Sequence, residues 1–234
     1  MQDKLPPPNR PYAFLRFPPD EDGPIRPVRL ESLTREEVDA YRTASTTDSP
    51  PSTKLPPAQS HTLMVDPSDD IDSNISSACF GTWNMAGQPP LNVVLKSYPI
   101  PEYCDNVLDE LDTYSAIAHM RLGPIVPTLH CILKAPTQAW IGLLLENAGR
   151  RICASGADGW QKLHLPRHEK NQLYNILAQL HRAGITHGDV APRNVLRRPD
   201  GSFCFIDFER SQRGHRCAGS TCEELGQFRE DLGV

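Results

Sequence analysis

The sequence has no run of 18 apolar residues, and its first residues, MQDKLPPPNR, lack the apolar core of a secretory signal. It also has no stripe of clustered lysine and arginine, and its formal net charge is −5. A general binder of nucleic-acid backbones needs a basic surface, so the charge argues against that class of protein. We therefore expect an intracellular protein of the cytoplasm or nucleus that binds neither membranes nor nucleic acids directly.

Cysteine follows no organised pattern. The seven cysteines are scattered, odd in number and never form a Cys-x-x-Cys pair. This usage is typical of reduced thiols in an intracellular protein. His215, Cys217 and Cys222 lie close together, but their spacing matches no usual zinc motif. The sequence therefore favours a loop with incidental thiols there over a metal site.

Proline is concentrated near the N-terminus, where 13 of the 23 prolines fall within the first 67 residues. Proline removes backbone donors and restricts φ, which favours extended linkers. We predict that residues 1–70 form a proline-rich, disordered tail and that residues 71–234 form the folded domain. Within the tail, SLTREEVDAYRT at 32–43 predicts a transient helix with a capping box of Thr34 and Glu37; a helix that docks to a partner is the alternative.

The rest of the sequence predicts strands first and helices later. Apolar runs between turn residues indicate strands, and apolar positions three and four residues apart indicate helices. The expected strands are 76–83, 91–98, 126–134 and 138–146, the expected helices are 106–120, 171–184 and 220–232, and a hairpin is expected over 194–209.

The segment THGDVAPRNVL, residues 186–196, carries the chemistry. It lies between an expected buried helix and the hairpin, and Asp207 ends the second strand of that hairpin. A hairpin brings its two ends together, so the oxygens of Asp189, Asn194 and Asp207 can converge. Hard cations such as Mg²⁺ prefer oxygen ligands, and a carboxylate outside the metal shell can accept a proton from a hydroxyl.

These residues resemble the catalytic core of the protein-kinase-like superfamily. The stretch LHRAGITHGDVAPRN is followed by IDFE at the superfamily's spacing. Its HGD form, with glycine where many protein kinases have arginine, is similar to aminoglycoside phosphotransferases and to small fungal kinase-like proteins. The resemblance spans about residues 74–210. It implies an α+β, bilobal fold with a β-rich N-lobe (about 71–146) and a shortened helical C-lobe (about 147–234).

The resemblance also implies roles for residues of the C-lobe. Asp189 would be the catalytic base, and Arg193 would place a positive charge near the transferred phosphoryl group. Asn194 and Asp207 would hold Mg²⁺ against the phosphates of ATP. His187 would brace the loop rather than react.

Residues of the expected N-lobe would bind ATP. Lys96, in NVVLK, would contact its phosphates and pair with Glu110 on the following helix. Gly81 would belong to the loop that covers the phosphates, in a stretch with few glycines. Glu146 and Asn147, in LLLENAG, would form the hinge that faces adenine.

The sequence therefore predicts a kinase that transfers the γ-phosphoryl group of Mg-ATP to a hydroxyl, with serine or threonine of a protein as the first choice of acceptor. There are few glycines near Gly81, Glu209 replaces the glycine of the usual D-F-G, and the segment after Glu209 is short. These three features keep two alternatives open. One is a pseudokinase that binds nucleotide and acts through partners. The other is a small-molecule kinase of the aminoglycoside-phosphotransferase type. A protein partner could bind the tail or complete the short C-lobe.

Overall fold

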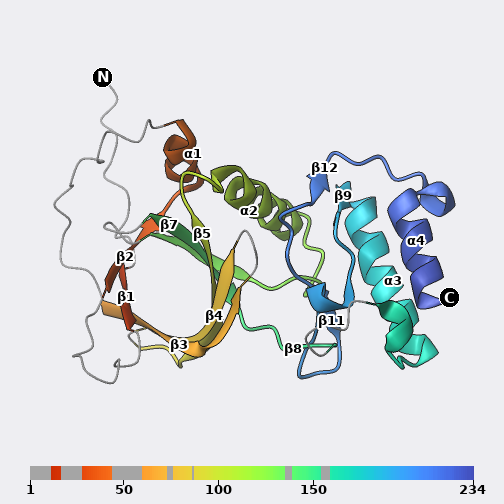
Figure 1. Cartoon of the computed structure of the whole chain (residues 1–234), viewed down its shortest axis with the longest axis horizontal. Coiled ribbons are helices and arrows are strands. Elements are labelled where there is room, and N and C mark those ends of the chain that lie inside the picture. Colours follow the sequence, from red (N-terminus) through yellow and green to blue (C-terminus); the bar gives the residue numbers. More distant parts are fainter. Residues whose placement is uncertain are drawn as a thin grey trace. The chain divides into compact units, whose positions relative to one another are not determined.

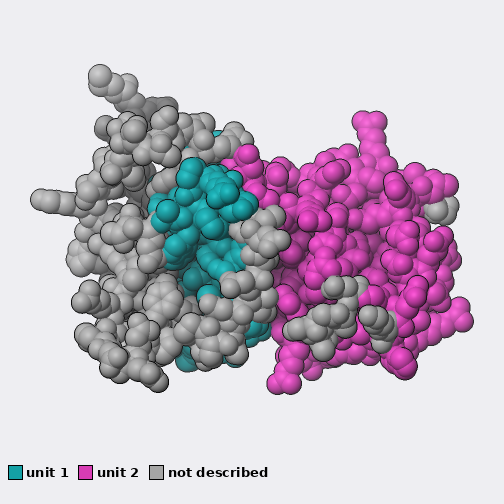
Figure 2. Space-filling model, viewed as in Figure 1, with its two compact units in different colours: residues 1–104, 129–147 teal, residues 105–128, 148–234 magenta. Residues whose placement is uncertain are grey.

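The structure is a computed structural model that describes residues 12–16, 28–43, 60–72, 76–85, 87–134, 139–153 and 159–234. The chain separates into two compact units, which Figure 2 distinguishes by colour. Unit 1 comprises Met1–Cys104 and Leu129–Asn147, and unit 2 comprises Asp105–Thr128 and Ala148–Val234. Each unit is a mixture of strands and helices, in agreement with the expected α+β class.

Unit 1 is a closed barrel with the strand order β1-β2-β6-β7-β5-β4-β3 (Figure 1). Neighbouring strands are antiparallel except β1 and β3, whose parallel pairing closes the barrel. The strands are β1 (Tyr12–Arg16), β2 (Val28–Leu33), β3 (Ser60–Asp72), β4 (Ser77–Asn84), β5 (Leu91–Pro99), β6 (Leu129–Lys134) and β7 (Trp140–Glu146). The expected strands of this region are therefore confirmed, with small shifts at their ends.

The interior of unit 1 is an apolar cluster formed by alternate residues of the strands. In β5, Val93 and Leu95 face this interior because successive side chains of a strand point to opposite faces. Gly142 on β7 leaves room for Leu95, since a Cβ at that position would lie 2.6 Å from Leu95 Cδ1. The buried members of the cluster are Leu63, Trp83, Val93, Leu95, Leu133 and Leu144.

Four elements lie within residues 1–70, where the sequence predicts a tail: β1, β2, most of β3 and α1 (Arg35–Thr43). Helix α1 has the predicted capping box, because the Glu37 N–H donates to Thr34 Oγ1 at 3.3 Å and the Thr34 N–H donates to Glu37 Oε2 at 2.8 Å. The prolines mainly lie between these elements, and Pro67 falls where the β3–β4 register shifts. The other residues of 1–70, for which disorder is predicted, lie outside the described residues.

Unit 2 combines helices with two small sheets. Strand order is β11-β10-β8 in one sheet and β12-β9 in the other. The helices are α2 (Cys104–His119, of which only Cys104 belongs to unit 1), α3 (Arg167–Arg182) and α4 (Glu223–Leu232), with short 3₁₀ turns η1 (Trp160–Lys162), η2 (Pro192–Asn194) and η3 (Gly219–Thr221). The strands are β8 (Arg150–Arg151), β9 (Ile185–Thr186), β10 (Val195–Arg197), β11 (Phe203–Phe205) and β12 (Gln212–Arg213).

Helices α3 and α4 of unit 2 lie side by side (Figure 1). The predicted apolar stripe of α3 is confirmed, with Leu173, Ile176, Leu177 and Leu180 all buried. Helix α4 contributes Leu225, Phe228 and Leu232 to the same interior. None of the helices in the described ranges is both long enough and apolar enough to cross a membrane.

We expect Leu177→Ala to lower the free energy of unfolding by about 2–5 kcal/mol, because it removes a fully buried side chain and leaves a cavity. Urea denaturation followed by far-ultraviolet circular dichroism measures this loss. Arg182→Ala is the control, since Arg182 is exposed on the same helix and its loss should change stability by no more than about 0.5 kcal/mol. Equal losses for the two variants would contradict the position of Leu177 in the core.

Candidate active site

The predicted catalytic loop connects β9 to the hairpin β10–β11. This hairpin pairs Val195 with Phe205, and the Ile206 N–H donates to the Asn194 carbonyl at 2.9 Å. Asn194 is thus held opposite Ile206, the residue before Asp207. The structure therefore places the two predicted metal ligands close to each other along the backbone, as expected for the two ends of a hairpin.

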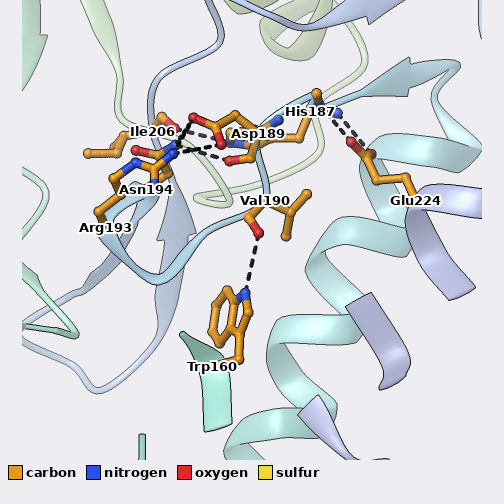
Figure 3. A network of polar contacts seen from close by, with 9 residues as sticks. Trp160, His187, Asp189, Val190, Arg193, Asn194, Ile206 and Glu224 are labelled. Atoms are coloured by element: carbon orange, nitrogen blue, oxygen red, sulfur yellow. Dashed lines mark hydrogen bonds and ion pairs between the residues drawn. The ribbon is translucent and has the colours of Figure 1, made fainter. Parts of the chain in front are cut away.

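The Asp189 carboxylate is held by two neighbours on the same loop (Figure 3). Arg193 Nη2 donates to both carboxylate oxygens, at 2.8 Å and 2.9 Å. Asn194 Nδ2 donates to Asp189 Oδ2 and to the Asp189 carbonyl, each at 3.0 Å. The side chains of Asp189 and Arg193 are 23% and 42% exposed, so the pair is fixed in orientation and still reachable from solvent.

His187 is completely buried and braces the loop. Its Nε2 lies 3.1 Å from the Ile206 carbonyl, and its Nδ1 lies 3.3 Å from the Asp189 amide nitrogen. These partners fit a neutral ring that carries its proton on Nε2 and accepts a hydrogen bond at Nδ1. Burial lowers the pKa of His187, which also favours the neutral form. The contacts match the bracing role that the resemblance implies.

Two residues that sequence reasoning did not single out also hold this loop (Figure 3). Glu224, on α4, accepts hydrogen bonds from the N–H groups of His187 at 3.0 Å and Gly188 at 2.6 Å. Trp160, in η1, donates from Nε1 to the Val190 carbonyl at 3.3 Å. No sequence signal marks either residue, since Glu224 is one of several acidic residues on α4 and η1 is far from the loop in sequence.

Glu224 is held in its charged form. Burial would raise the pKa of its carboxyl group, but hydrogen bonds from His181, His187 and Gly188 outweigh burial, so the pKa is lowered. The group is therefore a half-buried carboxylate whose charge is balanced by donors from α3 and from the predicted catalytic loop. Such a group fixes the position of whatever donates to it.

Asp207 has a left-handed backbone conformation, with φ of 71°. For a residue with a side chain, this conformation costs about 1–2 kcal/mol, although aspartate adopts it more readily than most residues. The next residue, Phe208, donates its N–H to Glu110 Oε1 at 3.4 Å, and Glu110 is completely buried. The structure thus brings Asp207 and Glu110 close together within unit 2. The predicted pairing of Glu110 with Lys96 stays a prediction, because Lys96 belongs to unit 1.

Lys96 lies in the middle of β5, where it pairs with Ala78 on β4 and with Leu143 on β7. Its side chain is buried, and its Nζ lies 5.3 Å from the centroid of the Tyr98 ring. A lysine in this position is costly to bury unless its charge is balanced. Its predicted contact with phosphates stays a prediction.

The other predicted ATP-binding residues also lie in unit 1. Gly81 lies within β4, paired with Val65 on β3 and Val93 on β5, so it belongs to a strand rather than to a loop. The connection between β3 and β4, residues 73–75, lies outside the described residues. Glu146 ends β7, and the Asn147 N–H donates to the Asn92 carbonyl at 3.1 Å, so that N–H is already used within unit 1.

The donor set of the hairpin suits a hard divalent cation. Both N–H bonds of the Asn194 amide are directed to Asp189, so its side-chain oxygen is the atom through which Asn194 could bind a metal. Asp207 adds a carboxylate one residue beyond the Ile206–Asn194 hydrogen bond. Oxygen ligands of this kind fit Mg²⁺, which usually keeps water or phosphate oxygens in its remaining positions.

Residues 150–229 match the lipopolysaccharide kinase (Kdo/WaaP) family. That family belongs to the protein-kinase-like superfamily, and the similarity supports a phosphotransferase. The Kdo/WaaP match covers about a third of the chain and includes Asp189, Arg193, Asn194 and Asp207. Lys96, Glu110, Gly81, Glu146 and Asn147 lie outside it. No curated protein matches the chain.

The structure explains why glycine occupies position 188 in the HGD sequence, and this explanation can be tested. Gly188 has φ of 79°, and a Cβ there would lie 2.1 Å from the Arg210 carbonyl oxygen. We expect Gly188→Ala to lower the free energy of unfolding by about 1–2 kcal/mol for the left-handed backbone and by about 1–3 kcal/mol more for the steric overlap. Chemical denaturation measures the difference.

Gly201→Ala separates the two contributions. Gly201 has φ of 85°, but a Cβ there would meet nothing within 4 Å. This control should show the backbone cost alone, about 1–2 kcal/mol. If both substitutions cost the same, the close approach of Gly188 to Arg210 is not a constraint on the loop.

Proposed function

We propose that the protein is an ATP-dependent phosphotransferase that transfers the γ-phosphoryl group of Mg-ATP to a hydroxyl of a small molecule, with sugars as the preferred class. The observation that carries the proposal is the Asp189 carboxylate, held by Arg193 and Asn194 on a loop within the segment that matches the Kdo/WaaP family. The family's name refers to a glycolipid acceptor, so it favours a sugar hydroxyl over serine or threonine of a protein. No comparison supports a protein acceptor.

Asp189 and Arg193 supply complementary parts of the reaction. The Asp189 carboxylate accepts a hydrogen bond from the acceptor hydroxyl and orients its oxygen for attack on the γ-phosphorus. It takes the proton as the new P–O bond forms and the bond from the γ-phosphorus to the β,γ-bridging oxygen breaks, which releases ADP. The Arg193 guanidinium lies beside this carboxylate, where it stabilises negative charge on the transferred group. Positioning and charge stabilisation of this kind provide most of the catalysis in phosphoryl transfer.

Asn194 and Asp207 are the residues that would hold Mg²⁺, through the amide oxygen and the carboxylate. Bound there, the ion would neutralise charge on the ATP phosphates. Asn194 also fixes Asp189 through its amide nitrogen, so one side chain orients both the base and the metal site. Within the same proposal, Lys96, Glu110, Glu146 and Asn147 keep their predicted roles in ATP binding, and Gly81 would approach the phosphates from strand β4 rather than from a loop.

A nucleotide-binding module without turnover is the second candidate. The observation that favours it is the engagement of the Asp189 carboxylate, which already accepts hydrogen bonds from Arg193 and Asn194. Because both oxygens already have donors, an acceptor hydroxyl would have to compete with Arg193 and Asn194 for this carboxylate. A pseudokinase of this kind would bind Mg-ATP and act through a partner protein.

Asp189→Asn is expected to reduce phosphoryl transfer from ATP by about 10²- to 10⁴-fold, because the amide keeps the shape of the carboxylate but cannot take the proton. The measurement is transfer of labelled phosphate from ATP to a panel of sugars, aminoglycosides and a serine/threonine-rich protein. Asp200→Asn is the matched control, since Asp200 lies at the turn of the hairpin and accepts hydrogen bonds only from Ser202 among the described residues.

The outcomes of this experiment separate the candidates. Transfer to a sugar that Asp189→Asn loses and Asp200→Asn keeps supports the proposal. Transfer to the protein alone would overturn the acceptor class. Nucleotide binding with no transfer to any acceptor would favour the module, and equal rates for wild type and Asp189→Asn would exclude Asp189 as the base.

Asp207→Asn should raise the Mg²⁺ concentration required for half-maximal transfer, because a neutral amide binds the cation more weakly than a carboxylate does. A Mg²⁺ titration at saturating ATP measures this shift. Glu209→Gln is the control, since Glu209 is two residues away but outside the proposed ligand set. An unchanged Mg²⁺ requirement in Asp207→Asn would remove Asp207 from the metal site.

A further inference from the structure

A second group of chemically active side chains lies in unit 2, outside the catalytic loop. It consists of His181 at the end of α3, His215 and Cys217 in the segment after β12, and Cys222 directly before α4. One ligand atom from each of the four residues lies within 4.8 Å of the others. His181 and Cys222 are buried, and the other two are half-buried. We call these four residues the His₂Cys₂ cluster.

Two distances within the cluster are close to those between ligands of one small ion. Cys222 Sγ lies 3.3 Å from His181 Nδ1 and 3.5 Å from His215 Nε2. Around tetrahedral zinc, with Zn–S of about 2.3 Å and Zn–N of about 2.0–2.1 Å, sulfur and nitrogen ligands are about 3.6 Å apart. Two imidazoles and two thiols are also a set that zinc prefers in proteins.

We propose that His181, His215, Cys217 and Cys222 bind a structural zinc ion. Four protein ligands fill a tetrahedral shell and leave no open position for a substrate, which distinguishes a structural site from a catalytic one. The ion joins the end of α3, the segment after β12 and the start of α4. It supplies unit 2 with a cross-link between segments that are distant in sequence.

The surroundings of His181 match those of a metal-bound histidine. Its Nδ1 faces the cluster, while its Nε2 lies 2.5 Å from Glu224 Oε2. A histidine that binds metal through one nitrogen usually donates the other N–H to a carboxylate, which fixes the tautomer and the ring orientation. Glu224 therefore has the position of the carboxylate that orients a zinc-bound histidine.

Cys217 and Cys222 lie on the segment that leads into α4. Cys222 is the N-cap of α4, but its side chain makes no capping hydrogen bond, so its sulfur is not used to cap the helix. A pocket of about 470 Å³ whose lining includes His215, Cys222 and Glu224 gives an ion access to the cluster.

The proposed site is connected to the catalytic loop through Glu224. The same carboxylate that contacts His181 Nε2 also accepts hydrogen bonds from the N–H groups of His187 and Gly188. A bound ion holds His181, His181 orients Glu224, and Glu224 holds the backbone that leads to Asp189. This chain of contacts does not depend on which acceptor the enzyme phosphorylates.

Metal content is the direct test. The full chain, expressed without a histidine tag, should contain about one zinc ion per chain by inductively coupled plasma mass spectrometry. Replacement by Co²⁺ should give the visible bands of tetrahedral cobalt and the near-ultraviolet charge transfer of cobalt–thiolate bonds. A chain that takes up neither ion would overturn the proposal, and so would a Cys217–Cys222 disulfide found by peptide mass spectrometry.

Substitutions of single cysteines test which residues bind the zinc ion. Cys217→Ser should weaken zinc affinity at least about 10-fold, because serine is a poor ligand for zinc. Cys153→Ser, at a half-buried cysteine of unit 2 outside the cluster, should leave the affinity unchanged. A zinc chelator should lower the melting temperature of wild type and of Cys153→Ser but not that of Cys217→Ser. Equal zinc affinity in wild type and Cys217→Ser would overturn the assignment.

Glu224→Gln tests the connection to His181 and leaves all four ligands in place. Loss of an orienting carboxylate typically weakens metal affinity by about 10- to 100-fold, and we expect a loss in that range. Unchanged affinity would overturn the role of Glu224. These measurements use no ATP, so a failure of the phosphotransferase proposal and a failure of the zinc proposal give different results.

Discussion

The organisation of unit 2 depends on one half-buried carboxylate, that of Glu224. Its two oxygens accept the N–H groups of His187 and Gly188 and contact His181 Nε2. A charge partly removed from water is costly unless donors replace its lost hydration, so loss of one of these contacts is expected to destabilise the unit. The backbone of the predicted catalytic loop is therefore fixed to α4 and, through His181, to α3.

The position of Asp189 follows from the hydrogen bonds of Glu224 to the loop backbone. His187, fixed through its backbone, uses both ring nitrogens to bridge the Ile206 carbonyl and the Asp189 N–H. The chain then passes so close to Arg210 that only glycine can occupy position 188. An arginine in that place, as in many protein kinases, would need a different path of the loop. The HGD sequence thus reflects the packing of the loop against the segment after β11.

The sequence was sufficient for the local part of this arrangement. Periodicity predicted α3 and its stripe, and the spacing of Asp189, Asn194 and Asp207 predicted a loop followed by a hairpin that joins them. It was insufficient where distant segments meet. His181 lies 34 residues before His215, and no local pattern links it to Glu224. The strands within residues 1–70 were missed because proline content was given more weight than the short apolar runs between the prolines.

The left-handed backbone at Asp207 shows how the hairpin can hold a strained residue. The N–H groups on both sides are occupied: that of Ile206 donates to the Asn194 carbonyl, and that of Phe208 donates to Glu110. With both flanking peptides bonded, the chain can relax at Asp207 only by breaking a hydrogen bond, which costs about as much as the strain itself. The direction of the Asp207 Cα–Cβ bond is therefore set by the backbone. This leaves only the side-chain torsions of Asp207 to be adjusted if, as proposed, it binds Mg²⁺, a cation that tolerates little variation in ligand geometry.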